Sequence, residues 1–199
     1  YESLESKGMS IFGRTQDAQR WTIYRMNNHS HNVLTVNDQL QQVSGYAKID
    51  KASETAGFQF AVSDISSVYN GQLKKAVRGV AVKDEKYVIV RDEIETMDKT
   101  TKIKWAMFTF ATVELENQSA ILTMGNEKLY LKVNGPANLT MKTWSTAPTN
   151  DYDAANPGTI VVGFECEIPA NTKENFEVLL VPEKSIGEAA PLNKSLSNW

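Results

Sequence analysis

Both histidines of this chain lie in one short stretch, residues 21–34, together with a tyrosine and an arginine. If the stretch forms a strand, His29 and His31 face the same side, roughly 6 to 7 Å apart at the backbone. Two imidazoles can bind a metal ion or transfer a proton. Tyr24 and Arg25 add a phenol and a permanent cation, which hydrogen-bond a sugar and hold a carboxylate. The stretch is the first candidate site, although two histidines that only satisfy backbone groups would give the same pattern.

Other patterns for catalysis are weaker. The single cysteine, Cys166, lies in an alternating apolar run, where a buried thiol is expected rather than a nucleophile. Asp64 and the pair Asp92-Glu93 suggest two carboxylates for glycoside hydrolysis, but surface carboxylates between strands are ordinary. The sequence contains no serine elbow, phosphate-binding glycine loop or zinc-finger spacing.

The tryptophans could form a platform for a sugar ring. Trp21, Trp105 and Trp144 each lie in a strand-like pattern, where a core position is the usual outcome. Trp144 adjoins residues 146–157, a stretch rich in Asp, Asn, Pro and Ala that we expect to be a long exposed loop. Trp144 is therefore the best stacking candidate of the three.

Apolar and polar residues alternate along most of the chain, and this period of two indicates half-buried strands. The clearest segments are residues 32–36, 58–62, 73–82, 86–90, 104–113, 128–133, 159–168 and 175–181. Turn residues such as Asn70-Gly71 and Gly125-Asn126 separate them. The pattern predicts an all-β fold, a two-layer antiparallel β-sandwich of about a dozen strands.

Size and charge limit the function classes. A chain of 199 residues with 41% hydrophobic residues can bury one continuous core. Its net charge of −3 provides no general field for nucleic acid or an anionic membrane, and no apolar stretch reaches the roughly 20 residues of a membrane span.

We expect residues 1–20 to be an irregular lead-in that ends an upstream region, and residues 21–199 to be the sandwich domain, with Trp199 docked on it.

Residues 21–49 read WTIYRMNNHSHNVLTVNDQLQQVSGYAKI. This segment resembles the signature region of heparinase II/III-like polysaccharide lyases, in which an Arg and a His-Asn-Thr-Leu-like segment precede a short turn and a Gln. Here the turn is residues 36–39, and Gln42 follows it. Val33 stands where the family usually has Thr, and Asn37-Asp38 replaces the usual Asp-Gly. The resemblance continues through residues 58–95, 102–115 and 152–158.

The resemblance implies the C-terminal β-sandwich of a larger enzyme. Family members join an N-terminal α/α-toroid to such a sandwich and cleave uronic-acid-containing polysaccharides by β-elimination. Their catalytic Tyr and His usually come from the toroid, so this chain alone is expected to be inactive and to form one wall of the substrate cleft. The resemblance implies a periplasmic or extracellular protein with an acidic polysaccharide as partner, and it makes these residues the candidate substrate-binding set: Tyr24, Arg25, His29, Asn32 and Trp144.

The resemblance also implies a zinc site. The family often holds zinc between the two domains, with a His and an Asp from an earlier segment and the His of the His-Asn motif, here His31. A zinc site needs three or four protein ligands, so we expect zinc only in the full-length parent and none in this chain.

A function of another class stays open. Sandwich folds have many unrelated functions. The chain could instead be a non-catalytic carbohydrate-binding or scaffolding module whose aromatic residues stack on glycans.

Overall fold

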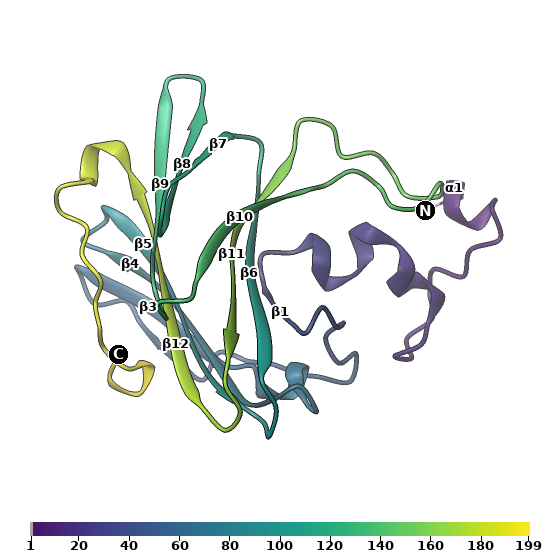
Figure 1. Cartoon of the computed structure of the whole chain (residues 1–199), viewed down its shortest axis with the longest axis horizontal. Helices are drawn as coiled ribbons and strands as arrows, with labels where there is room; N and C mark the ends of the chain where they lie inside the picture. Colours follow the sequence, from purple (N-terminus) through teal and green to yellow (C-terminus); the bar gives the residue numbers. More distant parts are fainter. Residues whose placement is uncertain (1) are drawn as a thin grey trace.

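A computed structural model describes residues 2–199, which form two antiparallel β-sheets packed face to face (Figure 1). The smaller sheet has four strands in the order β1-β6-β11-β10, and the larger has eight in the order β2-β3-β4-β5-β12-β9-β8-β7. Neighbouring strands are antiparallel throughout both sheets. The predicted all-β sandwich of about a dozen strands is confirmed.

The bounds of the strands are β1 (Leu34–Val36), β2 (Lys51–Ser53), β3 (Phe58–Asp64), β4 (Leu73–Lys83), β5 (Tyr87–Thr96), β6 (Thr101–Thr109), β7 (Thr112–Leu115), β8 (Ser119–Met124), β9 (Glu127–Asn134), β10 (Thr140–Ser145), β11 (Ile160–Ile168) and β12 (Lys173–Pro182). The helical elements are α1 (Glu2–Glu5) and the short 3-10 turns η1 (Gln19–Thr22), η2 (Tyr24–Met26), η3 (Asn28–Ser30), η4 (Ser66–Tyr69), η5 (Glu183–Ser185) and η6 (Leu196–Asn198). None of these helices is long and apolar enough to cross a membrane.

The strands differ from the clearest predicted segments. β2 and β8 lie outside those segments, β10 corresponds to the strand-like pattern around Trp144, β5 extends beyond residue 90 to Thr96, and the predicted segment 104–113 is two strands, β6 and β7. Because β6 belongs to the smaller sheet and β7 to the larger, the chain crosses between sheets at residues 110–111. The crossing contains no Gly or Pro, and the alternation of apolar and polar residues continues through it. The sequence pattern therefore does not reveal where β6 ends and β7 begins.

The core between the sheets is built around three aromatic rings. Trp105 of β6 lies parallel to Phe164 of β11 at a centroid distance of 6.0 Å, and Phe164 lies 5.4 Å from Phe176 of β12. Cys166 is buried in the same core, and this burial raises the pKa of its thiol to about 12. The predicted burial of Cys166 is confirmed, and a thiol that stays protonated is a poor nucleophile.

The C-terminal tail covers the outer face of the larger sheet (Figure 1). Trp199 packs edge-on against Phe58 and Phe60 of β3 at 5.4 and 5.8 Å, so its predicted docking is confirmed. Glu177 of β12 is fully buried, pairs with Arg91 at 2.9 Å and accepts a hydrogen bond from the backbone N–H of Leu192.

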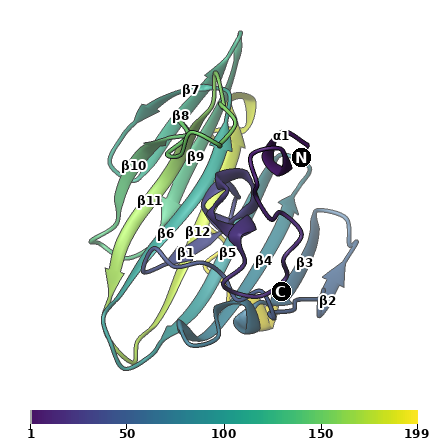
Figure 2. The same ribbon diagram turned by 90° about the vertical axis from the view of Figure 1, so that its right-hand side faces the viewer.

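The N-terminal segment lies on the other side of the molecule, against the smaller sheet (Figures 1 and 2). Residues 6–18 contain neither helix nor strand. Met9 and Ile11 form a small cluster with Ile23, and Tyr152 of the loop between β10 and β11 packs against it. The assignment of residues 1–20 to an upstream region stays a prediction.

Candidate functional site

The stretch that holds both histidines is not a strand. Residues 19–30 form the turns η1 to η3, and regular pairing begins only at Leu34. The side chain of Asn27 accepts a hydrogen bond from the His29 backbone N–H at 2.9 Å and caps η3. Asparagine side chains that bond to the local backbone favour turns over strands. The expectation that the two imidazoles face the same side of a strand is therefore wrong.

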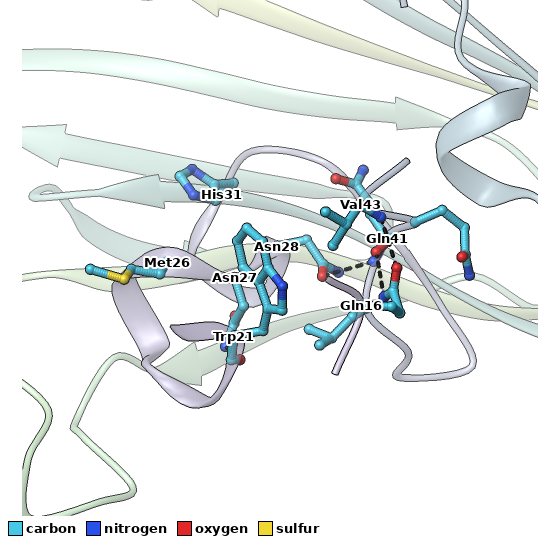
Figure 3. Close-up of a pocket in the computed structure, with 10 residues that line it drawn as sticks. Gln16, Trp21, Met26, Asn27, Asn28, His31, Gln41 and Val43 are labelled. Atoms are coloured by element: carbon cyan, nitrogen blue, oxygen red, sulfur yellow. Dashed lines mark hydrogen bonds between the residues drawn. The ribbon is translucent and has the colours of Figure 1, made fainter. Parts of the chain in front are cut away.

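The two histidines have different surroundings. His31 is exposed and lines a pocket with Trp21 (Figure 3). His29 is half-buried, and this burial lowers the pKa of its imidazole. The positive charge of nearby Lys104 lowers the pKa of His29 further, while Asp38 opposes that effect. The charges of Lys104 and Asp38 therefore both act on His29.

Tyr24 and Arg25 connect the N-terminal turns to the loop between β10 and β11. The Tyr24 ring is half-buried, 6.3 Å from the ring of Phe108, and its backbone N–H donates to the Asp153 carboxylate. Burial raises the pKa of the Tyr24 phenol. The exposed Arg25 guanidinium donates to the side chain of Asn156 at 2.7 Å and to the carbonyl of Ala155 at 2.6 Å. Two of its five N–H donors therefore hold the loop.

Asn32 fastens the end of the turns to the sandwich. Its side-chain oxygen accepts a hydrogen bond from the Phe108 backbone N–H at 2.8 Å. Phe108 lies in the part of β6 that extends beyond the first residue of β1. Its carbonyl accepts a bond from Arg78 at 3.1 Å. The exposed Asn32 amide nitrogen remains able to donate to a ligand.

Trp144 of β10 lies on the outer face of the smaller sheet beneath a lysine. The Lys104 ammonium of β6 lies 4.1 Å from the centroid of the Trp144 ring. Successive residues of a strand face opposite sides of the sheet. Lys104 is one position from Trp105 and Trp144 is three positions from Met141, and both Trp105 and Met141 belong to the buried core. Lys104 and Trp144 therefore face outward. Lysine over an indole face is a favourable cation–π pair.

The contact between Lys104 and Trp144 passes over the intervening strand β11. In the strand register, Lys104 pairs with Glu165 and Trp144 pairs with Val161, so Gly163 lies midway between them. A Cβ atom at Gly163 would lie 1.9 Å from the carbonyl oxygen of Trp105. A side chain at Gly163 would therefore displace the β6 backbone next to Lys104.

Lys104 carries a charge with no carboxylate partner. On the same face, Lys102 and Lys142 both pair with Glu165, at 3.1 and 2.6 Å. The Lys104 ammonium forms no salt bridge with any described residue, and burial lowers its pKa. Glu165 and Asp38 partly oppose this effect of burial, but their salt bridges are with Lys102 and Lys142. A half-buried cation whose nearby carboxylates are paired with other lysines gains from the arrival of an anion.

The carboxylates considered for glycoside hydrolysis are otherwise engaged. Asp92 is fully buried rather than on the surface, and both its oxygens accept from Arg78 at 2.7 and 2.9 Å. Glu93 pairs with Arg91, and Asp64 accepts a bond from the Ser66 backbone N–H.

His31 alone does not make a zinc centre. Within residues 2–199, no three His, Cys, Asp or Glu side chains are grouped so that they could hold a metal ion. The exposed His31 imidazole could supply one ligand, so the remaining ligands would have to come from another segment. Zinc in a longer parent protein stays a prediction.

No protein-family model and no curated protein matches this sequence. Solved structures match its fold. A crystal structure of heparinase III aligns with a TM-score of 0.65 and 14% identity over 80% of this chain. The fold is heparinase-like. A second heparinase III structure matches this heparinase-like fold with a TM-score of 0.65 and 16% identity over 92% of the chain. The heparan sulfate lyase HepC from Pedobacter heparinus gives 0.63 and 13% over 82%.

The chain spans only about a quarter of the solved proteins that its fold matches. It covers 24% of the first heparinase III, 29% of the second and 25% of HepC. Such coverage is consistent with a domain of a larger protein.

Lys104 and Trp21 were not among the predicted site residues. Lys104 occupies an ordinary alternating position, and only the register of β6, β11 and β10 brings it to Trp144. Trp21 looked like a core residue of a strand, whereas it is half-buried in η1 and lines the pocket with His31. Its position beside the His-Asn segment was the one signal in the sequence.

Proposed function

We propose that this chain is the β-sandwich domain of a longer polysaccharide lyase and forms one wall of a cleft for uronic-acid-containing polysaccharide. The observation that carries the proposal is the Lys104 ammonium on the outer face of the smaller sheet, which forms no salt bridge with a described residue and lies 4.1 Å from the centroid of the Trp144 ring. Its charge also lowers the pKa of His29. A cation next to aromatic and hydrogen-bonding groups suits an acidic sugar. The heparinase-like fold supports the same class of protein.

The domain would bind and orient substrate. β-Elimination requires neutralisation of the uronate carboxylate, removal of the adjacent proton and protonation of the leaving oxygen. Lys104 would neutralise a carboxylate or sulfate, while Tyr24, His29 and Asn32 would contact hydroxyl groups beside it. The proton transfers would fall to groups from another domain, and the parent protein would work in the periplasm or outside the cell.

The test compares this chain with a form extended upstream in its gene. Both are incubated with heparan sulfate and with alginate, and the ultraviolet absorbance of the unsaturated product is followed. We expect product from the extended form only, and binding of at least one polymer by both forms. Product from the short chain would contradict the assigned division of labour, and loss of binding in both forms would reject the proposal.

A non-catalytic carbohydrate-binding module is the second candidate. The half-buried Trp144 on an open sheet face favours it. A glycan array distinguishes the two: binding that survives the loss of His29 and His31 but not the loss of Trp144, with no product from the extended form, identifies the module.

A further inference from the structure

A concave site is lined by residues other than Lys104 and Trp144. It is a pocket of about 240 Å³ between the N-terminal turns and residues 40–43 (Figure 3). Trp21, Met26 and His31 line it from the turns, and Leu40, Gln42 and Val43 line it from the following segment. We call it the amide pocket, because asparagine and glutamine side chains hold its two sides together.

The walls of the amide pocket are preorganised. The Gln16 side chain donates to the Gln41 carbonyl at 3.0 Å and accepts from the Val43 backbone N–H at 2.8 Å. Asn28 is buried, and its side chain donates to the Gln39 carbonyl at 3.2 Å and accepts from the Gln41 N–H at 3.1 Å. The side-chain amides hold together two segments that have no strand pairing. Ligand binding therefore does not have to order the walls of the pocket, which lowers the entropic cost of binding.

Trp21 gives the pocket a fixed aromatic surface. Its indole N–H donates to the Thr15 carbonyl at 2.8 Å, and the Arg20 guanidinium lies 4.5 Å from the centroid of its ring. Both contacts fix the ring in the position in which it borders the pocket. A fixed indole offers large contact area at little entropic cost, which suits the C–H groups of a sugar ring.

Two polar side chains of the pocket are available to a ligand. The Gln42 amide and the His31 imidazole form no side-chain hydrogen bond with any described residue, whereas Gln16 and Asn28 are committed to the backbone. An amide and a neutral imidazole each donate and accept, as a pair of sugar hydroxyls requires. No Asp, Glu, Lys or Arg is among the residues that line the pocket.

We propose that the amide pocket binds one uncharged pyranose unit, stacked on Trp21 and hydrogen-bonded by Gln42 and His31. The volume of 240 Å³ equals that of about eight water molecules at roughly 30 Å³ each, enough for one ring and too little for an enclosed oligosaccharide. The absence of a charged lining group disfavours a uronate here. The inference does not depend on the lyase proposal, because it concerns other residues and another class of sugar unit.

The test is a nuclear magnetic resonance titration of the whole chain at about pH 8 with methyl glucoside, N-acetylglucosamine or glucuronate. We expect saturable shifts of the Trp21 indole N–H and the Gln42 side-chain amide with at least one uncharged sugar, and several-fold weaker binding of glucuronate. Absence of a saturable shift with both uncharged sugars, or tighter binding of glucuronate, would overturn the proposal. Binding of acidic polymer is measured separately, so either proposal can fail alone.

Gln42→Ala is the decisive variant. Removal of a neutral hydrogen bond should weaken the sugar affinity about fivefold while the spectrum elsewhere stays unchanged. Gln118→Ala, an exposed glutamine between β7 and β8, is the matched control and should bind like the original chain. Equal affinities of the two variants would remove Gln42 from the site and refute the assigned geometry.

Discussion

Lys104 is the residue on which binding of an acidic polymer should depend most, because its charge has no carboxylate partner on the face it shares with Trp144. Replacement by methionine keeps the aliphatic stem and removes the charge. A lost charge-assisted hydrogen bond predicts about tenfold weaker binding of whichever acidic polysaccharide binds the chain. Titration calorimetry at about 0.15 M salt measures the affinity.

Lys128→Met is the control for Lys104→Met. Lys128 is exposed on β9 of the larger sheet, so its removal changes the net charge equally without touching the outer face of the smaller sheet. We expect less than about a twofold change in affinity, because exposed remote charges are screened. Equal losses in both variants would mean that net charge, rather than a local site, attracts the polymer.

Cys166 predicts how stability depends on alkaline pH. Its pKa is about 12 in the folded chain, against 9.0 for an ordinary cysteine. Because the folded pKa is raised, the stabilisation from the protonated thiol is complete below about pH 9 and is lost as pH rises toward 12. Each pH unit in that interval costs up to about 1.4 kcal/mol of unfolding free energy.

The measurement is urea unfolding at pH 8 and at pH 10 for the original chain and for Cys166→Ala. Alanine leaves a small cavity, so the variant is less stable at pH 8. The gap between the two chains should narrow at pH 10. A gap that is independent of pH would mean that the thiol ionises as easily in the folded chain as in the unfolded one.

The sequence predicted the individual site residues only in part. His31 is accessible to solvent, as the prediction requires, and its role as a zinc ligand stays a prediction. The predicted relation between His29 and His31 was wrong, because the Asn27 side chain accepts a bond from the His29 backbone and the Asn28 side chain bonds to the backbone of Gln39 and Gln41. A period of two cannot reveal the first bond, and the bonds of Asn28 depend on residues that come near only in three dimensions.

At the scale of elements, Gly163 of β11 determines how the smaller sheet packs. Gly163→Ala places a methyl group against the Trp105 carbonyl, and one of the two strands must move. We expect a loss of about 3 kcal/mol in unfolding free energy, as for overpacked sites. Chemical denaturation followed by circular dichroism measures it.

Gly187→Ala is the matched control, since a Cβ atom there meets nothing within 4 Å and the residue has no positive φ. Its stability should change by less than about 0.5 kcal/mol. A similar loss in both variants would point to a general effect of glycine replacement and not to the contact with β6.

Strands that alternate between core and solvent were predictable, and the short edge strands were not. β4, β5, β11 and β12 have long alternating or apolar patterns. β2 has three residues, none of them buried, so hydrophobicity cannot distinguish it from a loop. Its pairing with β3 creates the strand, and that pairing is invisible in a local window.

At the scale of the whole molecule, the C-terminal tail seals one broad face of the sandwich. Trp199→Ala removes a ring packed on Phe58, Phe60 and Leu196, and should lower the unfolding free energy by about 3 to 5 kcal/mol. Phe110→Ala, at a ring that is 72% exposed, should cost much less. Thermal unfolding monitored by circular dichroism compares them, and equal losses would mean that the tail contributes little to the packed structure.

The two-layer architecture followed from composition and periodicity, whereas the distribution of strands between the layers did not. The order β2-β3-β4-β5-β12-β9-β8-β7 brings the last strand between strands that form earlier in the chain. Which distant strands pair depends on how the whole faces of the two sheets pack together. A local sequence pattern therefore cannot predict this strand order.

The path of the Lys104 side chain over Gly163 has a consequence for evolution. Three positions far apart in the chain, on β6, β10 and β11, take part in one contact, and a substituent on the middle strand would displace the Trp105 carbonyl beside Lys104. In an alignment of relatives, lysine at position 104 and tryptophan at 144 should therefore co-vary with glycine at 163. Lineages that have lost the glycine should have lost the pair as well.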